Sequence, residues 1–202
     1  MPGAVIVSFY TPEWEYRSRA EQLMRDCDRL GLAHDIVGRP SLNNWNRNTA
    51  MKPRFIAEML QKHDHLIWLD CDGALYQRPA LCMGQPHHVD FMAVPHQTMS
   101  DHPTSPRAWH TGLLAVRRTQ LSKQFVDSWA DICGYQQITD ELGFELVTRS
   151  FTGTIHALPP EYLRIIKWGE PVGDAVYNMG ISTSPDKMAM KARQRARGGE
   201  RG

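Results

Sequence analysis

Short continuous apolar runs, separated by amphipathic segments, constrain the fold of this chain more than any other feature. The run at residues 3–10, GAVIVSFY, is rich in β-branched side chains and predicts a buried strand. A strand of this kind needs cover on both faces, as strands of parallel sheets have. Residues 33–37 (AHDIV) and 65–70 (HLIWLD) predict two more strands. The first half of the chain therefore favours a covered, largely parallel sheet.

Helical patterns separate these strands. Residues 11–13 (Thr-Pro-Glu) predict a helix start, because Thr can cap, Pro suits the first helical position and Glu favours the positive end of the helix dipole. Apolar residues then recur at helical spacing until Gly31, a C-terminal stop. Residues 39–49 are polar and rich in turn formers, which predicts a loop. Pro53 begins the next helix.

The second half of the chain continues the alternation. Strands are expected at 89–95, 109–118, 154–158 and 174–182, and helices at 119–133, closed by Gly134, and at 139–150. The pattern predicts an α/β fold with a single Rossmann-like, mostly parallel mixed sheet flanked by helices. Because 202 residues suffice for one well-packed core, we expect one domain over residues 1–184 and a flexible tail at 185–202.

Charge and cysteine usage narrow the setting. A net charge of +1 gives no global argument for a polyanionic partner. The tail carries six Lys or Arg, which predicts a solvated end, with weak contact to an anionic lipid or nucleic-acid surface as the alternative. The four cysteines form no CxxC pair, and no secretory leader or apolar span of about 20 residues is present. We expect a cytoplasmic protein without a transmembrane segment.

Two aspartates end the strand predicted at residues 65–70. If the backbone stayed extended, the carboxylates of Asp70 and Asp72 would point to one face about 7 Å apart. They would repel each other and lose hydration, and a divalent cation such as magnesium or manganese would relieve both costs. In the alternative, one aspartate caps a turn and the other faces water. Because ligands of such sheets bind beyond the carboxyl ends of strands, the position favours the metal.

Residues 52–79, KPRFIAEMLQKHDHLIWLDCDGALYQRP, resemble the central segment of metal-dependent glycosyltransferases with the A-type (GT-A) fold. The likeness is greatest to the glycogenin-like and bacterial lipopolysaccharide galactosyltransferase group, and in motif order it extends from Val5 to Ser182. It implies the nucleotide-diphosphosugar transferase fold and transfer of a hexose, with retention, from a UDP-sugar. The D-x-D motif would hold Mn²⁺ or Mg²⁺. The acceptor stays open: a glycan, a lipid-linked glycan, a protein or a modified nucleic acid.

The resemblance also implies roles for residues near the donor. Asp70 and Asp72 match the metal and donor ligands. Thr11 and Tyr16 match positions that contact the uracil ring, although Tyr16 also fits a core contact of its helix. Lys52 matches a lysine that meets the donor diphosphate or sugar; otherwise it is an ordinary exposed lysine.

Two later segments match the sugar pocket of that group. His110, Thr111 and Gly112 resemble a strand start that lines the pocket, and a plain strand beginning is the alternative. Asp140 and Glu141 match an Asp-Gln pair that contacts the transferred sugar, and we expect a catalytic role for them together with Lys52. They also fit acidic residues at a helix start.

The chain departs from the pattern of the group near its end. Asn178 stands where the group has a histidine as third metal ligand, and an asparagine carbonyl is a neutral, weaker ligand. Lys187 matches the late phosphate-binding lysine, and Glu141 replaces the usual glutamine. The missing histidine leaves open a non-catalytic module that binds a nucleotide sugar or a nucleic-acid or envelope partner. A sugar-phosphate nucleotidyltransferase is a third alternative, but residues 8–17 lack the glycine-rich loop that it requires.

Overall fold

The computed structural model describes residues 3–13, 15–98, 107–166 and 173–179, together with Met188 and Ala192. Lys187 and most of the tail lie outside these residues, so the expectations about them stay predictions. In the described part of the chain, none of the helices combines the length and the apolar character that crossing a membrane requires.

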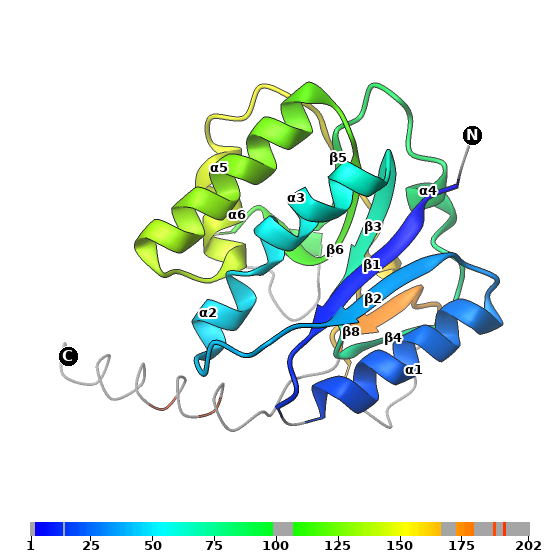
Figure 1. Cartoon of the computed structure of the whole chain (residues 1–202). Helices are drawn as coiled ribbons and strands as arrows, with labels where there is room; N and C mark the ends of the chain where they lie inside the picture. Colours follow the sequence, from blue (N-terminus) through cyan, green and yellow to red (C-terminus); the bar gives the residue numbers. More distant parts are fainter. Residues whose placement is uncertain are drawn as a thin grey trace.

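A six-stranded mixed sheet forms the centre of the structure, with strand order β2-β1-β3-β6-β5-β7 (Figure 1). Its strands are β1 Val5–Tyr10, β2 His34–Gly38, β3 His65–Leu69, β5 Phe91–Pro95, β6 Trp109–Arg117 and β7 Ile155–Ala157. β6 is antiparallel to both of its neighbours, and the other strand pairs are parallel. The predicted fold class, a single mostly parallel sheet flanked by helices, is confirmed.

Helices cover both faces of the sheet, as the continuous apolar strands require. The long helices are α1 Tyr16–Arg29, α3 Lys52–Lys62, α5 Gln120–Gln136 and α6 Asp140–Thr148. α1 packs on one face, where Leu23 joins a core with Ile67 of β3. α3, α5 and α6 lie together on the opposite face, where Phe55 and Trp129 share a second core with Trp68 (Figure 1). Successive residues of β3 thus serve opposite cores, as the strand period of two dictates.

Two short segments complete the edge at which β1 and β3 end. β4 Gly73–Leu75 pairs antiparallel with β8 Tyr177–Met179, with Gly73 opposite Met179. β4 was not predicted, because three residues are too few for a recognisable pattern. The remaining elements are short: α2 Trp45–Thr49, α4 Ala80–Met83, and 3₁₀ turns at His96–Thr98 (η1) and Pro160–Tyr162 (η2).

Several predicted boundaries were wrong. α1 begins at Tyr16 rather than within residues 11–13, and its N-cap residue, Glu15, makes no side-chain cap. The predicted loop 39–49 contains α2, because the Asn44 side chain accepts a hydrogen bond from the Arg47 amide at 3.1 Å and caps a helical turn. Gly134 lies inside α5, which ends at Gln136, and Gln137 takes the left-handed conformation that terminates it.

Candidate active site

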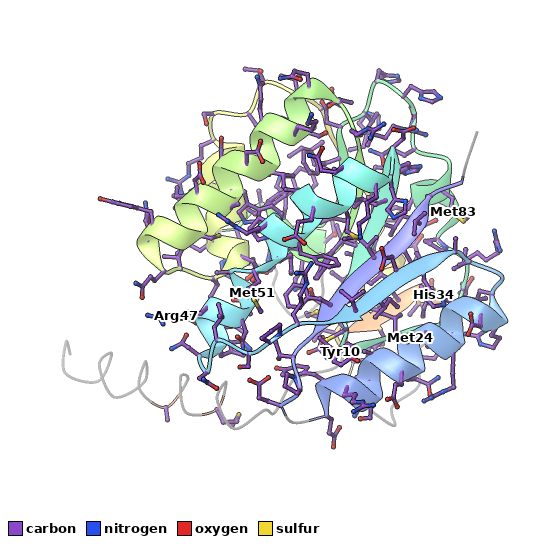
Figure 2. All side chains as sticks on the ribbon, in the orientation of Figure 1. Tyr10, Met24, His34, Arg47, Met51 and Met83 are labelled. Carbon is purple, nitrogen blue, oxygen red and sulfur yellow. The ribbon has the colours of Figure 1, made fainter. Side chains whose placement is uncertain are left out.

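The carboxyl end of β3 places Asp70 at the centre of a sheet edge. In Figure 2, Tyr10 at the end of β1 and Met51 just before α3 lie toward this same edge. The Asp70 amide donates to the Gly112 carbonyl at 2.9 Å, and the Tyr177 hydroxyl donates to the Asp70 carbonyl. The backbone of Asp70 is therefore fixed from β6 on one side and from β8 on the other.

Four predicted site residues meet next to this point: Lys52, Asp70, Thr111 and Asp140, which we call the Lys52 cluster. Lys52 Nζ lies 2.8 Å from Asp70 Oδ1 and 2.5 Å from Asp140 Oδ2. It also donates to the Thr111 carbonyl at 3.1 Å, and the Thr111 hydroxyl donates to Asp140 Oδ2 at 2.7 Å. The cluster joins the start of α3, the end of β3, β6 and the start of α6. The alternative of an exposed lysine at position 52 was wrong, since Lys52 is 5% exposed.

Lys52 carries a positive charge into this buried position. Burial alone lowers the pKa of Lys52, but the charges of Asp140 and Asp70 and their hydrogen bonds outweigh it and raise this pKa above its ordinary value. The ammonium also lies 5.3 Å from the centre of the Trp68 ring, a cation–π distance. Lys52 thus compensates part of the negative charge at the end of the apolar strand, a role for which the sequence pattern had offered a metal, or a turn cap and solvent.

Oδ2 of Asp70 and the carboxylate of Asp72 are the kind of ligand that a hard divalent cation prefers. The contacts made by Lys52 and by the Trp68 indole N–H, at 2.9 Å, both use Oδ1 of Asp70. Within the described part of the chain, Oδ2 of Asp70 receives no hydrogen bond, and the side chain is 25% exposed. Asp72 follows in the half-buried turn before β4. Carboxylate oxygens of this kind suit manganese or magnesium.

Asn178 occupies a different environment from the one expected of a third ligand. Its side-chain oxygen accepts from the Ile166 amide at 2.8 Å, and its side-chain nitrogen donates to the Ile166 carbonyl at 3.2 Å. Tyr177 reaches Asp70, and Met179 lies against Gly112. Because neighbouring side chains of a strand point to opposite faces, Asn178 points away from Asp70. The geometry argues against Asn178 as a metal ligand.

The two residues expected at the uracil ring flank the end of β1. Thr11 is buried directly after β1, and Tyr16 is half-buried at the first residue of α1. Their place beyond the carboxyl end of a parallel strand agrees with a nucleotide site in an open sheet. Their contact with a base stays a prediction.

A second polar cluster adjoins the first: His96, Arg107, His110 and Glu141, which we call the His96 cluster. Glu141 Oε1 lies 3.0 Å from His96 Nε2 and 3.7 Å from His110 Nε2, and Arg107 pairs with Oε2. The His110 Nδ1 accepts from the Gly112 amide at 2.9 Å. Burial and the charge of Arg107 lower the pKa of His96 to about 4, so this ring is neutral at neutral pH.

His96 and Arg107 were not among the site residues predicted from the sequence. Both residues lie between the strands predicted at 89–95 and 109–118, eleven positions apart. The only sequence signal was their place after a predicted strand, at the edge where ligands bind. Nothing in the spacing of His96 and Glu141 connects them, since 45 positions separate the two.

Comparisons with known proteins identify the fold. No protein-family model matches the chain, and no curated protein matches its sequence. A glycosyltransferase involved in the glycosylation of the major capsid of PBCV-1 is similar in structure, with a TM-score of 0.67, 16% identity, and coverage of 88% of this chain and 93% of that one.

Two further solved structures are similar. Mouse xyloside xylosyltransferase 1 has a TM-score of 0.56 at 10% identity, covering 90% of this chain and 99% of that chain. The glycosyltransferase GlyE of Streptococcus pneumoniae TIGR4 has a TM-score of 0.61 at 11% identity, covering 89% of this chain and 55% of that chain. At such low identities the likeness shows the fold, and it confirms the GT-A-like architecture.

Proposed function

We propose that this chain is a glycosyltransferase that moves a hexose from a UDP-sugar to an acceptor, using Mn²⁺ or Mg²⁺ held by Asp70 and Asp72. One observation carries the proposal: at the carboxyl end of the central strand, the D-x-D motif lies beside a buried lysine shared with Asp140. The similarity in fold to glycosyltransferases supports it. When bound, the cation would supply positive charge to the diphosphate of the donor.

Two residues of the Lys52 cluster stabilise opposite charges that develop during the transfer. The ammonium of Lys52 stays protonated and provides a fixed positive charge on the diphosphate side as negative charge develops there. Asp140 provides a negative charge for the sugar as it becomes positive. Its carboxylate is oriented by Thr111 at 2.7 Å, and its backbone carbonyl accepts from the Trp129 indole N–H at 2.7 Å.

Asp140 acts in this proposal by its charge and not as a nucleophile. Oδ2 of Asp140 already accepts from the Thr111 hydroxyl and contacts the ammonium of Lys52, and such contacts lower the reactivity of a carboxylate. Retention of configuration in this proposal therefore does not use Asp140 as the nucleophile. Glu141 stays outside the mechanism, because Arg107 and two histidines engage its carboxylate.

Donor hydrolysis tests the proposal without knowledge of the acceptor. The full chain is incubated with UDP-glucose, UDP-galactose, UDP-N-acetylglucosamine and GDP-mannose, with Mn²⁺ or with EDTA, and nucleotide release is measured. We expect release from one UDP-sugar that requires the metal and falls about 100-fold or more in Asp70→Asn and in Asp72→Asn. Asp127→Asn, on the exposed face of α5, is the matched control and should hydrolyse normally.

Full hydrolysis by the doubly substituted protein in EDTA would exclude the D-x-D site. Binding of a UDP-sugar by calorimetry, without hydrolysis under any metal condition, would favour the non-catalytic module instead. The orientation of Asn178 toward Ile166 is the observation that keeps this second function in view, because it leaves two aspartates as the protein ligands among the described residues.

A further inference from the structure

Three potential metal ligands converge in the His96 cluster, from three separate elements. His96 lies in η1, which follows β5 directly, His110 is the second residue of β6, and Glu141 lies in the first turn of α6. One ligand atom from each of the three lies within 4.8 Å of the other two. The two imidazole side chains are 6% and 8% exposed and the carboxylate 18%, so the group is enclosed but reachable from solvent.

We propose that His96, His110 and Glu141 form a binding site for a divalent transition-metal ion of the zinc type, separate from the D-x-D motif. Two imidazoles and one carboxylate are a donor set that zinc favours, whereas the oxygen-only D-x-D motif suits magnesium or manganese. Three protein ligands leave a fourth position for water or another ligand.

Two of the three distances between ligand atoms are close to those of a zinc site, and the third, between the two histidines, is within 4.8 Å. In a tetrahedral zinc site with bonds of about 2.0–2.1 Å, neighbouring ligand atoms lie roughly 3.3 Å apart. Glu141 Oε1 lies 3.0 Å from His96 Nε2 and 3.7 Å from His110 Nε2, so one distance is slightly short and the other slightly long. Arg107 pairs with Oε2 and would orient the carboxylate, as outer-shell partners of ligating carboxylates do.

Hydrogen bonds that the ligand residues already make oppose the metal and lower its affinity. His96 Nε2 donates to Glu141 Oε1 at 3.0 Å, and this bond must break before both atoms can bind the ion. Because His110 Nδ1 accepts from the Gly112 amide, neutral His110 carries its proton on Nε2 in this state. Coordination through Nε2 moves this proton to Nδ1, where it faces the Gly112 amide proton, so the hydrogen bond from Gly112 is lost. A lost hydrogen bond of this kind weakens binding by about tenfold, so we expect a reversible site rather than a permanently filled one.

Zinc titration of the full-length protein, stripped of metal with a chelator, tests the site. Calorimetry is performed on the Asp70→Asn/Asp72→Asn protein, in which the oxygen-only site is removed, and on the same protein with His96→Gln added. We expect one equivalent of Zn²⁺ to bind to the first protein and the affinity to fall about 100-fold or more in the second. His88→Gln on the same background is the matched control, because His88 and His156 form an exposed ring pair, 6.2 Å apart, that could bind zinc adventitiously.

Two spectroscopic measurements keep the test decisive if His96→Gln unfolds. Co²⁺ added to the protein with intact histidines should give the strong visible absorption of a tetrahedral site, and the Gly112 amide resonance should shift on zinc binding as its hydrogen bond is lost. Absence of stoichiometric zinc binding, unchanged affinity in His96→Gln, or loss of zinc in His88→Gln overturns the proposal. Mn²⁺-dependent donor hydrolysis, measured on parent protein, reports on the proposed transferase independently.

Discussion

The Lys52 cluster and the His96 cluster are built from neighbouring residues but differ in chemistry. Thr111 and Asp140 belong to the first cluster. His110, which precedes Thr111, and Glu141, which follows Asp140, belong to the second. The first contains its own cation, since the ammonium of Lys52 lies between two carboxylates. The second surrounds one carboxylate with two imidazoles and an arginine. Adjacent residues of β6, and adjacent residues of α6, therefore belong to two different kinds of electrostatic site.

Side chains that meet at the same edge of the sheet can therefore have different roles. The raised pKa of Lys52 keeps its ammonium protonated at neutral pH, so the Lys52 cluster contains a permanent positive charge. The imidazoles of the His96 cluster offer lone pairs to a metal instead. Four changes test this contrast, and they are ordered by the size of the effect that we expect.

Removal of Lys52 should have the largest effect. Lys52→Met leaves Asp70 and Asp140 without their common cation, and breaking a buried ion pair on one side costs about 3–5 kcal/mol. Urea unfolding at neutral pH measures the loss, and Lys123→Met on α5 is the control. An unfolding free energy of Lys52→Met within about 1 kcal/mol of the parent value would show that the ion pairs of the Lys52 cluster do not stabilise the fold.

His65 provides a pH effect that must be separated from both clusters. Burial, followed by the charge of Arg117, lowers the pKa of His65 from 6.5 to about 4. At His65 the unfolded chain therefore takes up a proton first as the pH falls. His65 contributes a loss of up to about 3 kcal/mol of native stability between pH 6.5 and pH 4, with its full contribution present above that window. His96, whose pKa is also lowered to about 4, adds a loss in the same window. Thermal melts across this range should show the loss, and His65→Gln should reduce its slope. An unchanged slope in the variant would assign the pH effect elsewhere.

Gly73→Ala tests the backbone that orients Asp70. A Cβ at Gly73 would lie 2.0 Å from the Tyr177 hydroxyl oxygen and 2.1 Å from its ring, so the ring must move and release the Asp70 carbonyl. Overpacking of this kind costs about 1–3 kcal/mol, and it should lower donor hydrolysis while zinc affinity at the His96 cluster is retained. Gly134→Ala, which meets open space within α5, is the control and should stabilise by about 0.5–1 kcal/mol. Equal losses of hydrolysis and zinc affinity in Gly73→Ala would join the two clusters into one unit.

Asn178→Ala should have the smallest effect. The change removes two hydrogen bonds to the Ile166 backbone and should cost about 1–2 kcal/mol of stability. Because Asn178 points away from Asp70, we expect the Mn²⁺ dependence of donor hydrolysis to stay as in the parent. A clear rise in the Mn²⁺ concentration needed for half-maximal hydrolysis would restore Asn178 as the third ligand and enlarge the first site.

The long helices, the central strands and the place of the D-x-D motif could be predicted from the sequence, whereas the short elements α2, α4 and β4 were not. A short continuous apolar run ending in Asp70, rich in large apolar residues, indicates a covered strand, and the alternation with helices indicates a mostly parallel sheet. The three residues of β4 are too few to give a recognisable pattern. At Asn178, a shift of one position changes the face of the strand to which the side chain points, and the sequence pattern did not resolve that position.

Which polar side chains meet depends on the tertiary structure. Lys52 reaches Thr111 across 59 positions, Thr111 reaches Asp140 across 29, and His96 reaches Glu141 across 45. Periodicity reports which face of its own element a residue occupies, but not which other element faces it. That choice follows from the order and register of the strands, since β6 inserts antiparallel between β3 and β5 and brings Thr111 and His110 to the edge where those strands end. The two clusters are consequences of this insertion, which no local pattern encodes.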